Sequence, residues 1–265
     1  MTIAILTGHP HNPYAAAVLR AMNAHGIRGI HVLAAAWNAG PRSLTSLVRR
    51  HGTRSLSVGA TWLAKRLMRP LRDIVRPRGA TSGLATDVEQ QGGRFVQVGD
   101  ANGEECRKAL AALDVDILVL AGAPIVRANI LAVPRVGTLN AHQGRLPQYR
   151  GMNVIEWAIF EGGTPTVTVH FVDCGVDTGD IVVREEIGIQ PGDSLQSIRA
   201  RAADKQAELL AWAVLASRSG PLPRLAQRAT EGRQYYAMHP HLRAVAERRL
   251  AKSYAAANGV PGSRR

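Results

Sequence analysis

The sequence predicts an α/β domain in which helices cover both faces of a doubly wound, mostly parallel sheet. One observation behind this is that short apolar runs alternate with segments of helical periodicity. Ile3–Leu6 and Gly29–Ala34 predict strands, and Tyr14–His25 between them predicts a helix. A second observation is that Asp116–Leu120 is almost continuously apolar, which is typical of a parallel strand buried on both faces.

The other elements follow in chain order. Ahead of the buried run, the pattern predicts part of a helix, a strand and a capped helix at Asp87–Gln91, Phe95–Val98 and Asn102–Leu113. Beyond it we expect a short buried strand at Val136–Leu139 and a helix at Asn153–Phe160, with Asn153 as its N-cap. Two further strands are expected at Thr166–Val172 and Ile181–Ile189. Asp193 or Ser194 caps a long helix, which Pro221 and Pro223 end.

The length of 265 residues and the apolar content of 46% suit a globular chain with a full core. We expect a catalytic domain at 1–220, with a basic insertion at about 41–79, and a short basic extension at 221–265 that forms a short helix and a disordered end. No apolar run is long enough to span a membrane, and the first residues do not resemble a secretory signal. The two cysteines, Cys106 and Cys174, cannot form a disulfide framework or a metal cluster, so we expect a cytoplasmic enzyme.

The formal charge of +13 is unevenly distributed. Ten arginines and lysines lie between Arg42 and Arg78, against Asp73 alone. Apolar residues at roughly helical spacing, such as Trp62 and Leu67, make this segment resemble an amphipathic basic helix. Such a helix can pack on the domain, cover a nucleotide phosphate, or meet a membrane surface or a nucleic acid. We predict that it serves an amine substrate.

Polar groups suited to acyl transfer follow two of the predicted strands. Asn140 and His142 lie two residues apart, so an extended backbone places both side chains on one side. The loop Asp173–Asp180 carries three carboxylates. An amide can donate to a developing oxyanion, an imidazole can move a proton, and a carboxylate can orient the imidazole. Each residue also has a structural use, since Asn140 can cap a turn and Asp177 can form an Asx turn.

The run N-A-H-Q-G-R-L-P-Q-Y-R-G, followed by H-F-V-D-C-G-V-D-T-G-D-I, resembles the folate-dependent formyltransferases. That group includes the sugar N-formyltransferases, glycinamide ribonucleotide formyltransferase and methionyl-tRNA formyltransferase. Asn140, His142 and Asp177 fall on its three catalytic positions, Asp177 because it begins D-T-G. The chain departs from the usual S-L-L-P at Gly144 and Arg145, which leaves the contacts of that loop open.

The resemblance implies a Rossmann-like formyltransferase fold and binding of 10-formyltetrahydrofolate without a metal. The folate contacts it implies are Ala121, Gly122, Ala123, Pro124, Ile125, Val126 and Arg127, together with Asp173, Gly175 and Val176. For contacts with the substrate amine we name Gly8, His9, Asn12 and His170. The turn that carries the first three can bind an anion at a helix N-terminus or simply be a tight turn.

The activity implied is transfer of a formyl group to a primary amine, for which our first choice is an amino sugar on a nucleotide. About 42 residues follow Pro223, too few for the β-barrel of methionyl-tRNA formyltransferase, so we do not expect a nucleic-acid partner. A glycinamide ribonucleotide-type reaction on another small amine stays open, as does a homodimer. Two further alternatives are a non-catalytic basic binding module and a hydrolase that releases formate.

Overall fold

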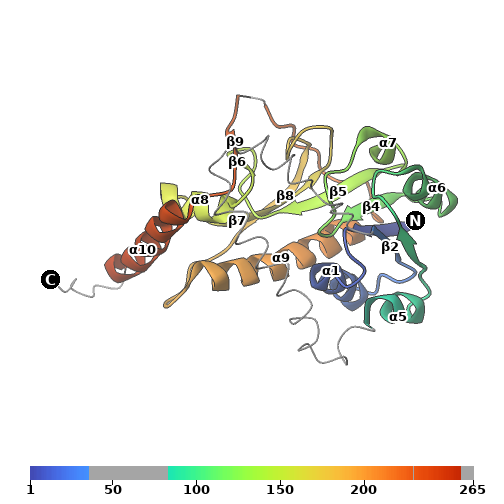
Figure 1. Ribbon diagram of the computed structural model, residues 1–265, viewed down its shortest axis with the longest axis horizontal. Helices are drawn as coiled ribbons and strands as arrows, with labels where there is room; N and C mark the ends of the chain where they lie inside the picture. The colour runs from blue at the N-terminus through green and yellow to red at the C-terminus, as the bar shows by residue number, and fades with distance from the viewer. Residues whose placement is uncertain (36–82, 229, 258–265) are drawn as a thin grey trace, which may run out of the picture.

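The structure is a computed structural model that describes residues 1–35, 83–228 and 230–257. The basic segment Arg42–Arg78 therefore lies outside the described residues. A seven-stranded sheet forms the centre, in the order β3-β2-β1-β4-β5-β7-β8 (Figure 1). Its strands are β1 (Ile3–Thr7), β2 (His31–Ala35), β3 (Phe95–Val98), β4 (Ile117–Leu120), β5 (Gly137–His142), β7 (Thr166–Phe171) and β8 (Ile181–Glu186).

The first five strands of this order are parallel, and β7 and β8 are antiparallel to their neighbours. The chain runs outward from β1 to β2 and β3, then returns to place β4 on the other side of β1. This reversal is a topological switch point, beside which ligands bind at the carboxyl ends of the strands. The predicted doubly wound, mostly parallel sheet is therefore confirmed.

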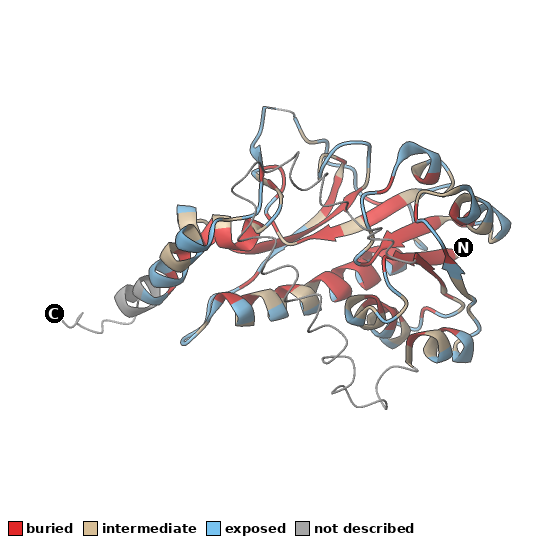
Figure 2. Ribbon diagram, in the orientation of Figure 1, coloured by how far each residue is buried: buried red, intermediate tan, exposed pale blue. Residues whose placement is uncertain are grey.

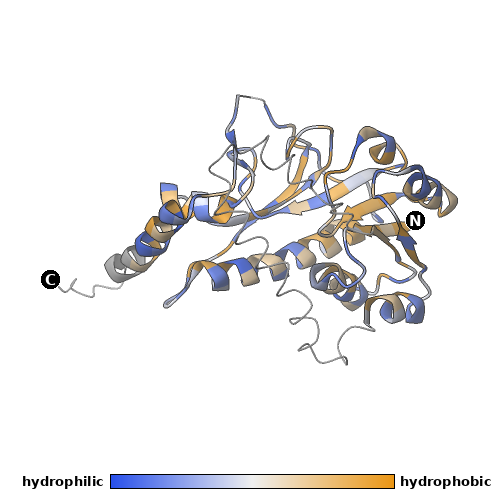
Figure 3. Ribbon diagram, in the orientation of Figure 1, coloured by the Kyte–Doolittle hydropathy of each residue, from blue (hydrophilic) through white to orange (hydrophobic). Residues whose placement is uncertain are grey.

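Helices cover both faces of the sheet. One core packs the strands against α1 (Pro13–Ala24), α5 (Gly83–Gln90) and α9 (Leu195–Ala216), and the other packs them against α6 (Glu104–Ala112) and α7 (Ala128–Leu131). The central strands are almost continuously buried, while each helix buries one side (Figure 2). Figure 3 shows the same division in hydropathy, with apolar residues concentrated on the strands. None of the described helices combines the length and apolarity that crossing a membrane requires.

Strand β5 is longer than predicted. The expected strand ended at Leu139, with Asn140 and His142 after it, but both residues lie within β5. The reason is that β7 pairs antiparallel with this end of β5 and matches Asn140 to His170 and His142 to Thr168. Backbone pairing with a strand distant in sequence thus extends the strand beyond its apolar run.

The predicted caps had mixed outcomes. Ser194, one of the two candidates, caps α9 through a capping box with Ser197. Helix α8 (Val154–Glu161) follows Asn153 as predicted, but the Asn153 side chain makes no cap hydrogen bond. It accepts instead from the backbone N–H of Met238 at 3.1 Å. Helix α6 begins at Glu104 without a side-chain cap, because Asn102 bonds to another loop.

The C-terminal segment, residues 221–257, contains the predicted helix, α10 (Pro240–Ala257), which has 18 residues. It also contains a strand that we did not predict, β9 (Arg233–Tyr235). Strand β9 pairs in parallel with β6 (Tyr149–Gly151), and α10 packs on α8. The predicted disorder at 258–265 lies outside the described residues. Long-range pairing, which has no periodic signature in a three-residue strand, accounts for the missed element.

Candidate active site

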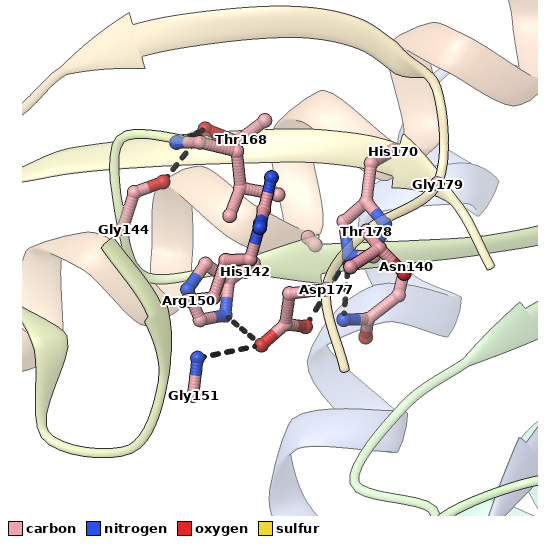
Figure 4. Close-up of polar contacts among 12 residues, drawn as sticks. Asn140, His142, Gly144, Arg150, Gly151, Thr168, His170, Asp177, Thr178 and Gly179 are labelled. Carbon is pink, nitrogen blue, oxygen red and sulfur yellow. Dashed lines mark hydrogen bonds and ion pairs between the residues drawn. The ribbon is translucent and has the colours of Figure 1, made fainter. Parts of the chain in front are cut away.

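Three predicted residues meet where β5 ends (Figure 4). Asn140 and His142 project from β5, and Asp177 comes from the loop between β7 and β8. The Nδ1 atom of His142 lies 3.5 Å from Oδ2 of Asp177. The side chains are largely enclosed, with 8% of His142 and 15% of Asp177 exposed. The structure thus brings together an amide, an imidazole and a carboxylate from positions up to 37 residues apart in the sequence.

His170 joins the same cluster from β7. Its Nε2 lies 3.2 Å from Nδ2 of Asn140 and 3.6 Å from Oδ1 of Asp177. Only 2% of its side chain is exposed. We named His170 as an amine contact, and that role stays a prediction, but the structure places the ring between the amide and the carboxylate. The register of β5 and β7 explains this, because it sets Asn140 directly opposite His170.

Backbone carbonyls fix the orientation of both rings. Nε2 of His142 lies 2.8 Å from the carbonyl oxygen of Tyr149, and Nδ1 of His170 lies 2.7 Å from that of Phe171. A carbonyl oxygen only accepts, so each of these nitrogens carries a proton. In the neutral rings, the remaining nitrogen is bare and faces the Asp177 carboxylate. The cluster is therefore arranged to take up one proton beside a negative charge.

The surroundings of the cluster lower the pKa of both His142 and Asp177, each for a different reason. Burial lowers the pKa of His142 below its ordinary value of 6.5, although the Asp177 carboxylate and the Tyr149 carbonyl oppose this. Burial alone would raise the pKa of Asp177. Hydrogen bonding from His170 and the charge of His142, both of which act when the ring carries a second proton, and the N–H of Gly151 outweigh burial and bring the pKa of Asp177 to about 2. Near neutral pH the site thus holds a carboxylate beside a neutral His142.

This lowered pKa predicts the pH dependence. If neutral His142 accepts the proton, kcat/KM should fall on acidification with a midpoint below 6.5, because only the protonated ring is inactive. Titration of the His142 ring by NMR distinguishes this from protonation of the substrate. His239→Gln, in an exposed histidine on the C-terminal segment, should leave the midpoint unchanged. A ring that titrates above 6.5 would contradict the prediction.

The loop of Asp177 is tightly built. Asp177 adopts φ 54°, a left-handed conformation unusual for a residue other than glycine. Its Oδ2 accepts from the backbone N–H of Gly151 at 2.9 Å. Asp173, by contrast, uses Oδ1 within the loop, where it accepts from the Gly175 N–H at 3.0 Å and the Thr178 hydroxyl at 2.6 Å. Asp177 is therefore the carboxylate that faces the imidazoles.

Gly144, where the chain departs from the family motif, lies very close to the His142 ring and the Tyr149 carbonyl. A Cβ atom there would lie 2.7 Å from both His142 Nε2 and the Tyr149 carbonyl. In this arrangement the glycine lets the carbonyl reach the ring. The neighbouring departure, Arg145, is exposed and pairs with Glu186 on β8 at 2.8 Å. Neither residue disturbs the cluster.

The predicted folate loop, Ala121–Arg127, follows β4 and is held at both ends. Asn12 donates to the Ala121 carbonyl at 3.2 Å, and the Gly8 N–H donates to the Gly122 carbonyl at 3.1 Å. Asn102 donates to the Ile125 carbonyl at 2.9 Å and accepts from the Arg127 N–H at 2.7 Å. Asn12, a predicted amine contact, therefore braces this loop and caps α1.

Among the remaining predicted positions, Val126 is buried at 6% exposure and packs in the core on the α6 side of the sheet, whereas others are accessible. Val176 is 39% exposed and Ile125 is 82% exposed. His9 is exposed in the first turn, where its Nδ1 accepts from the His11 N–H at 3.0 Å. Within the part of the chain that the structure describes, no group of three or more histidines, cysteines and acids is arranged to hold a metal ion.

Two residues that support the loop of Asp177 were not singled out from the sequence: Gln227 and Arg150, which bonds to Gln227. Arg150 belongs to the R-G step of the motif, so the resemblance already contained its signal. Gln227 lies beyond the resembling region, and its local sequence gives no indication of a contact. Its amide donates to the carbonyls of Asp177 at 3.1 Å and Gly179 at 2.6 Å.

Comparisons with known proteins give a family match and several relatives. The profile described as formyl transferase matches residues 81–214, about half of the chain. A methionyl-tRNA formyltransferase from Koribacter versatilis is 39% identical over 111 residues, which cover 41% of this chain and 36% of that protein. The matched part thus spans little more than a third of this curated relative.

Solved structures share the fold over most of the chain. A sugar N-formyltransferase from a Shewanella species superposes with a TM-score of 0.58 at 13% identity and covers 94% of this chain and 87% of that one. The phosphoribosylglycinamide formyltransferase from Streptococcus pneumoniae gives a TM-score of 0.53 at 19% identity and covers 82% of this chain and 98% of that one. At these identities the similarity concerns the fold alone.

Proposed function

Because the chain belongs to the formyl transferase family, we propose that it transfers a formyl group from 10-formyltetrahydrofolate to a primary amine. The observation that carries this proposal is the enclosed cluster of Asn140, His142 and Asp177, in which His142 and Asp177 lie 3.5 Å apart. No serine or cysteine nucleophile is needed, because the substrate amine attacks the formyl carbon itself.

Each residue has a role in this reaction. Asn140 uses one N–H toward His170 and retains a second N–H that can donate to the oxyanion that develops on the formyl group. His142 and Asp177 take the proton that the attacking amine loses, because the bare Nδ1 faces the carboxylate. The bond between the formyl carbon and N10 of the folate then breaks, and N10 receives this proton as tetrahydrofolate leaves. The Tyr149 carbonyl keeps the ring in this tautomer. The N–H of Gly151 holds the carboxylate in place by donating to Oδ2 at 2.9 Å.

The loop after β4 fits the flat heterocycle of a folate, which supplies the formyl group when bound. Its first three residues are Ala121, Gly122 and Ala123, so a ring can approach the backbone closely. Among the described residues, the N–H groups of Gly122 and Ala123 have no acceptor, which leaves them available to the edge of a pterin. The loop between β7 and β8, with Asp173, Gly175 and Val176, offers a second wall.

Ala123→Trp should weaken folate binding while the protein stays folded. The indole would fill the space beside the backbone, and we expect the Kd for the folate to rise about tenfold or more, equivalent to about 1.4 kcal/mol. Calorimetric titration with a folate analogue measures this. Ala111→Trp, at an exposed position of α6, is the matched control. Unchanged folate affinity in Ala123→Trp would remove this loop from the proposed site.

For the amine, we propose an amino sugar carried on a nucleotide. The net charge of +13 suits an anionic carrier, and the fold matches that of sugar N-formyltransferases. A second candidate is the methionyl group of a charged tRNA, which the 39% identity to a methionyl-tRNA formyltransferase favours. The same net charge suits that polyanion.

One assay distinguishes these functions. The protein is incubated with 10-formyltetrahydrofolate and, in separate reactions, nucleotide-linked amino sugars, glycinamide ribonucleotide, charged methionyl-tRNA or no amine. Formylation of a sugar with the highest kcat/KM supports the first proposal, and formylation of the tRNA replaces it with the second. Formate release without an amine would identify a hydrolase. No turnover, with nucleic-acid affinity that falls steeply with salt, would identify a binding module.

A further inference from the structure

The C-terminal segment contacts the loop that carries Asp177 and binds the backbone of that loop. Gln227 lies between α9 and β9 on a stretch that the family profile, which ends at residue 214, does not include. Its Nε2 lies 3.1 Å from the Asp177 carbonyl and 2.6 Å from the Gly179 carbonyl. An amide nitrogen carries two protons, so one side chain can make both bonds. Two carbonyls on either side of Thr178 are thereby fixed together.

Arg150 orients this amide. Its Nε and Nη2 each lie 3.4 Å from Oε1 of Gln227, and Nη2 also donates to the Arg228 carbonyl at 3.2 Å. Since a guanidinium only donates, it selects the oxygen of the amide and directs the nitrogen toward the loop. Arg150 is 7% exposed, and the hydrogen-bond partners of its guanidinium among the described residues are the Gln227 amide and the Arg228 carbonyl, both neutral. A nearly buried cation paired only with neutral acceptors is costly, which favours a specific role over a stabilising one.

Strand β6, which carries Arg150, also holds the Asp177 carboxylate. Gly151 follows Arg150 on β6 and donates its N–H to Oδ2 of Asp177 at 2.9 Å. Strand β9 presses against this residue so closely that a Cβ on Gly151 would lie 2.2 Å from the Tyr235 carbonyl. Asp177 is therefore held in two ways: Gln227 of the C-terminal segment binds its backbone carbonyl, and Gly151 of β6, which pairs with β9, binds its carboxylate.

We propose that Arg150 and Gln227 are positioning residues that hold the Asp177 carboxylate against His142 in a left-handed backbone conformation. The conformation, with φ 54°, is unfavourable for an aspartate by itself, so the surrounding contacts must maintain it. The catalytic consequence rests on the proposed function, but the placement of the carboxylate does not. The segment after α9 is accordingly part of the active site and not a separate appendage.

Gln227→Met tests this, because it keeps the length of the side chain and removes the donor without adding charge. We expect kcat to fall about 10²-fold, the effect of misplacing a catalytic group by about 1 Å, with little change in either KM. The His142 ring should titrate at lower pH than in the wild type, because the carboxylate that raises its pKa is less closely held. Gln234→Met, on the exposed side of β9, should change neither quantity.

Further variants keep the test decisive. Arg150→Met should lower kcat similarly, and the double variant should be no worse than either single one, because one residue acts through the other. Gln227→Asn replaces Gln227→Met if thermal unfolding shows that the latter does not fold. Normal kcat and an unchanged His142 titration in a folded variant would overturn the proposal, as would loss of folding in both. If the wild type transfers no formyl group, the His142 titration alone still decides whether the pair positions the carboxylate.

Discussion

Asp177→Asn is expected to fold normally and to lose about 10⁴-fold in kcat, the loss seen when the orienting aspartate of a serine-protease triad is replaced. The reason is that Asp177 faces the bare nitrogens of His142 and His170, at 3.5 and 3.6 Å, and an amide cannot stabilise the proton that arrives there. The pKa of His142 should also fall further, since the carboxylate raises it. Formyl transfer under saturating substrates and NMR titration measure the two effects.

The control for this variant is Asp173→Asn in the same loop. The Oδ1 atom of Asp173 accepts from Gly175 and Thr178, and an asparagine oxygen at that place can accept the same two bonds. We therefore expect near-normal turnover. If Asp173→Asn lost activity while Asp177→Asn kept it, the assignment of the catalytic carboxylate would be wrong.

Asn140→Ala is expected to lower kcat by about 10²–10³-fold, as removal of one oxyanion-hole donor does in other acyl-transfer enzymes. The effect should appear in kcat and not in the KM for the folate, because the charge that Asn140 stabilises develops only in the transition state. Steady-state kinetics with both substrates varied measures this. Asn140→Asp, which keeps the shape and removes the donor, should be at least as inactive.

Asn23→Ala on α1 is the matched control for the lost amide. Its side-chain oxygen lies 3.5 Å from a nitrogen of Arg28, well outside the cluster, so we expect wild-type kinetics. An Asn140→Ala enzyme that binds the folate poorly but turns over normally would assign Asn140 to binding and contradict its role as an oxyanion donor.

Much of the fold followed from local patterns. The β-α-β start and the buried run Asp116–Leu120 predicted the parallel sheet, because alternation of short apolar runs with helical periods is a property of the sequence itself. Phe95–Val98 has the predicted limits. The spacing of Asn140 and His142 also predicted that both side chains lie on one face of the sheet, since side chains two residues apart on a strand point the same way.

The choice of Asp177 came from the D-T-G motif, and its place beside His142 is consistent with that choice. Composition and spacing alone left the three carboxylates of the loop equivalent. Folding distinguishes them, because it directs Asp173 into the loop and Asp177 toward the imidazoles.

Other features depend on contacts that no local pattern encodes. His170 reaches Asn140 only because β7 pairs antiparallel with β5, and Gln227 reaches Asp177 only because the chain returns past the loop after α9. Strand β9 exists as a partner for β6 and has no periodicity of its own. The sequence by itself determined most of the elements of the central sheet and the residues that we propose for the chemistry. The tertiary structure decided the tautomers, the charge state and the support of the carboxylate, because these depend on backbone carbonyls, N–H groups and burial contributed by distant segments.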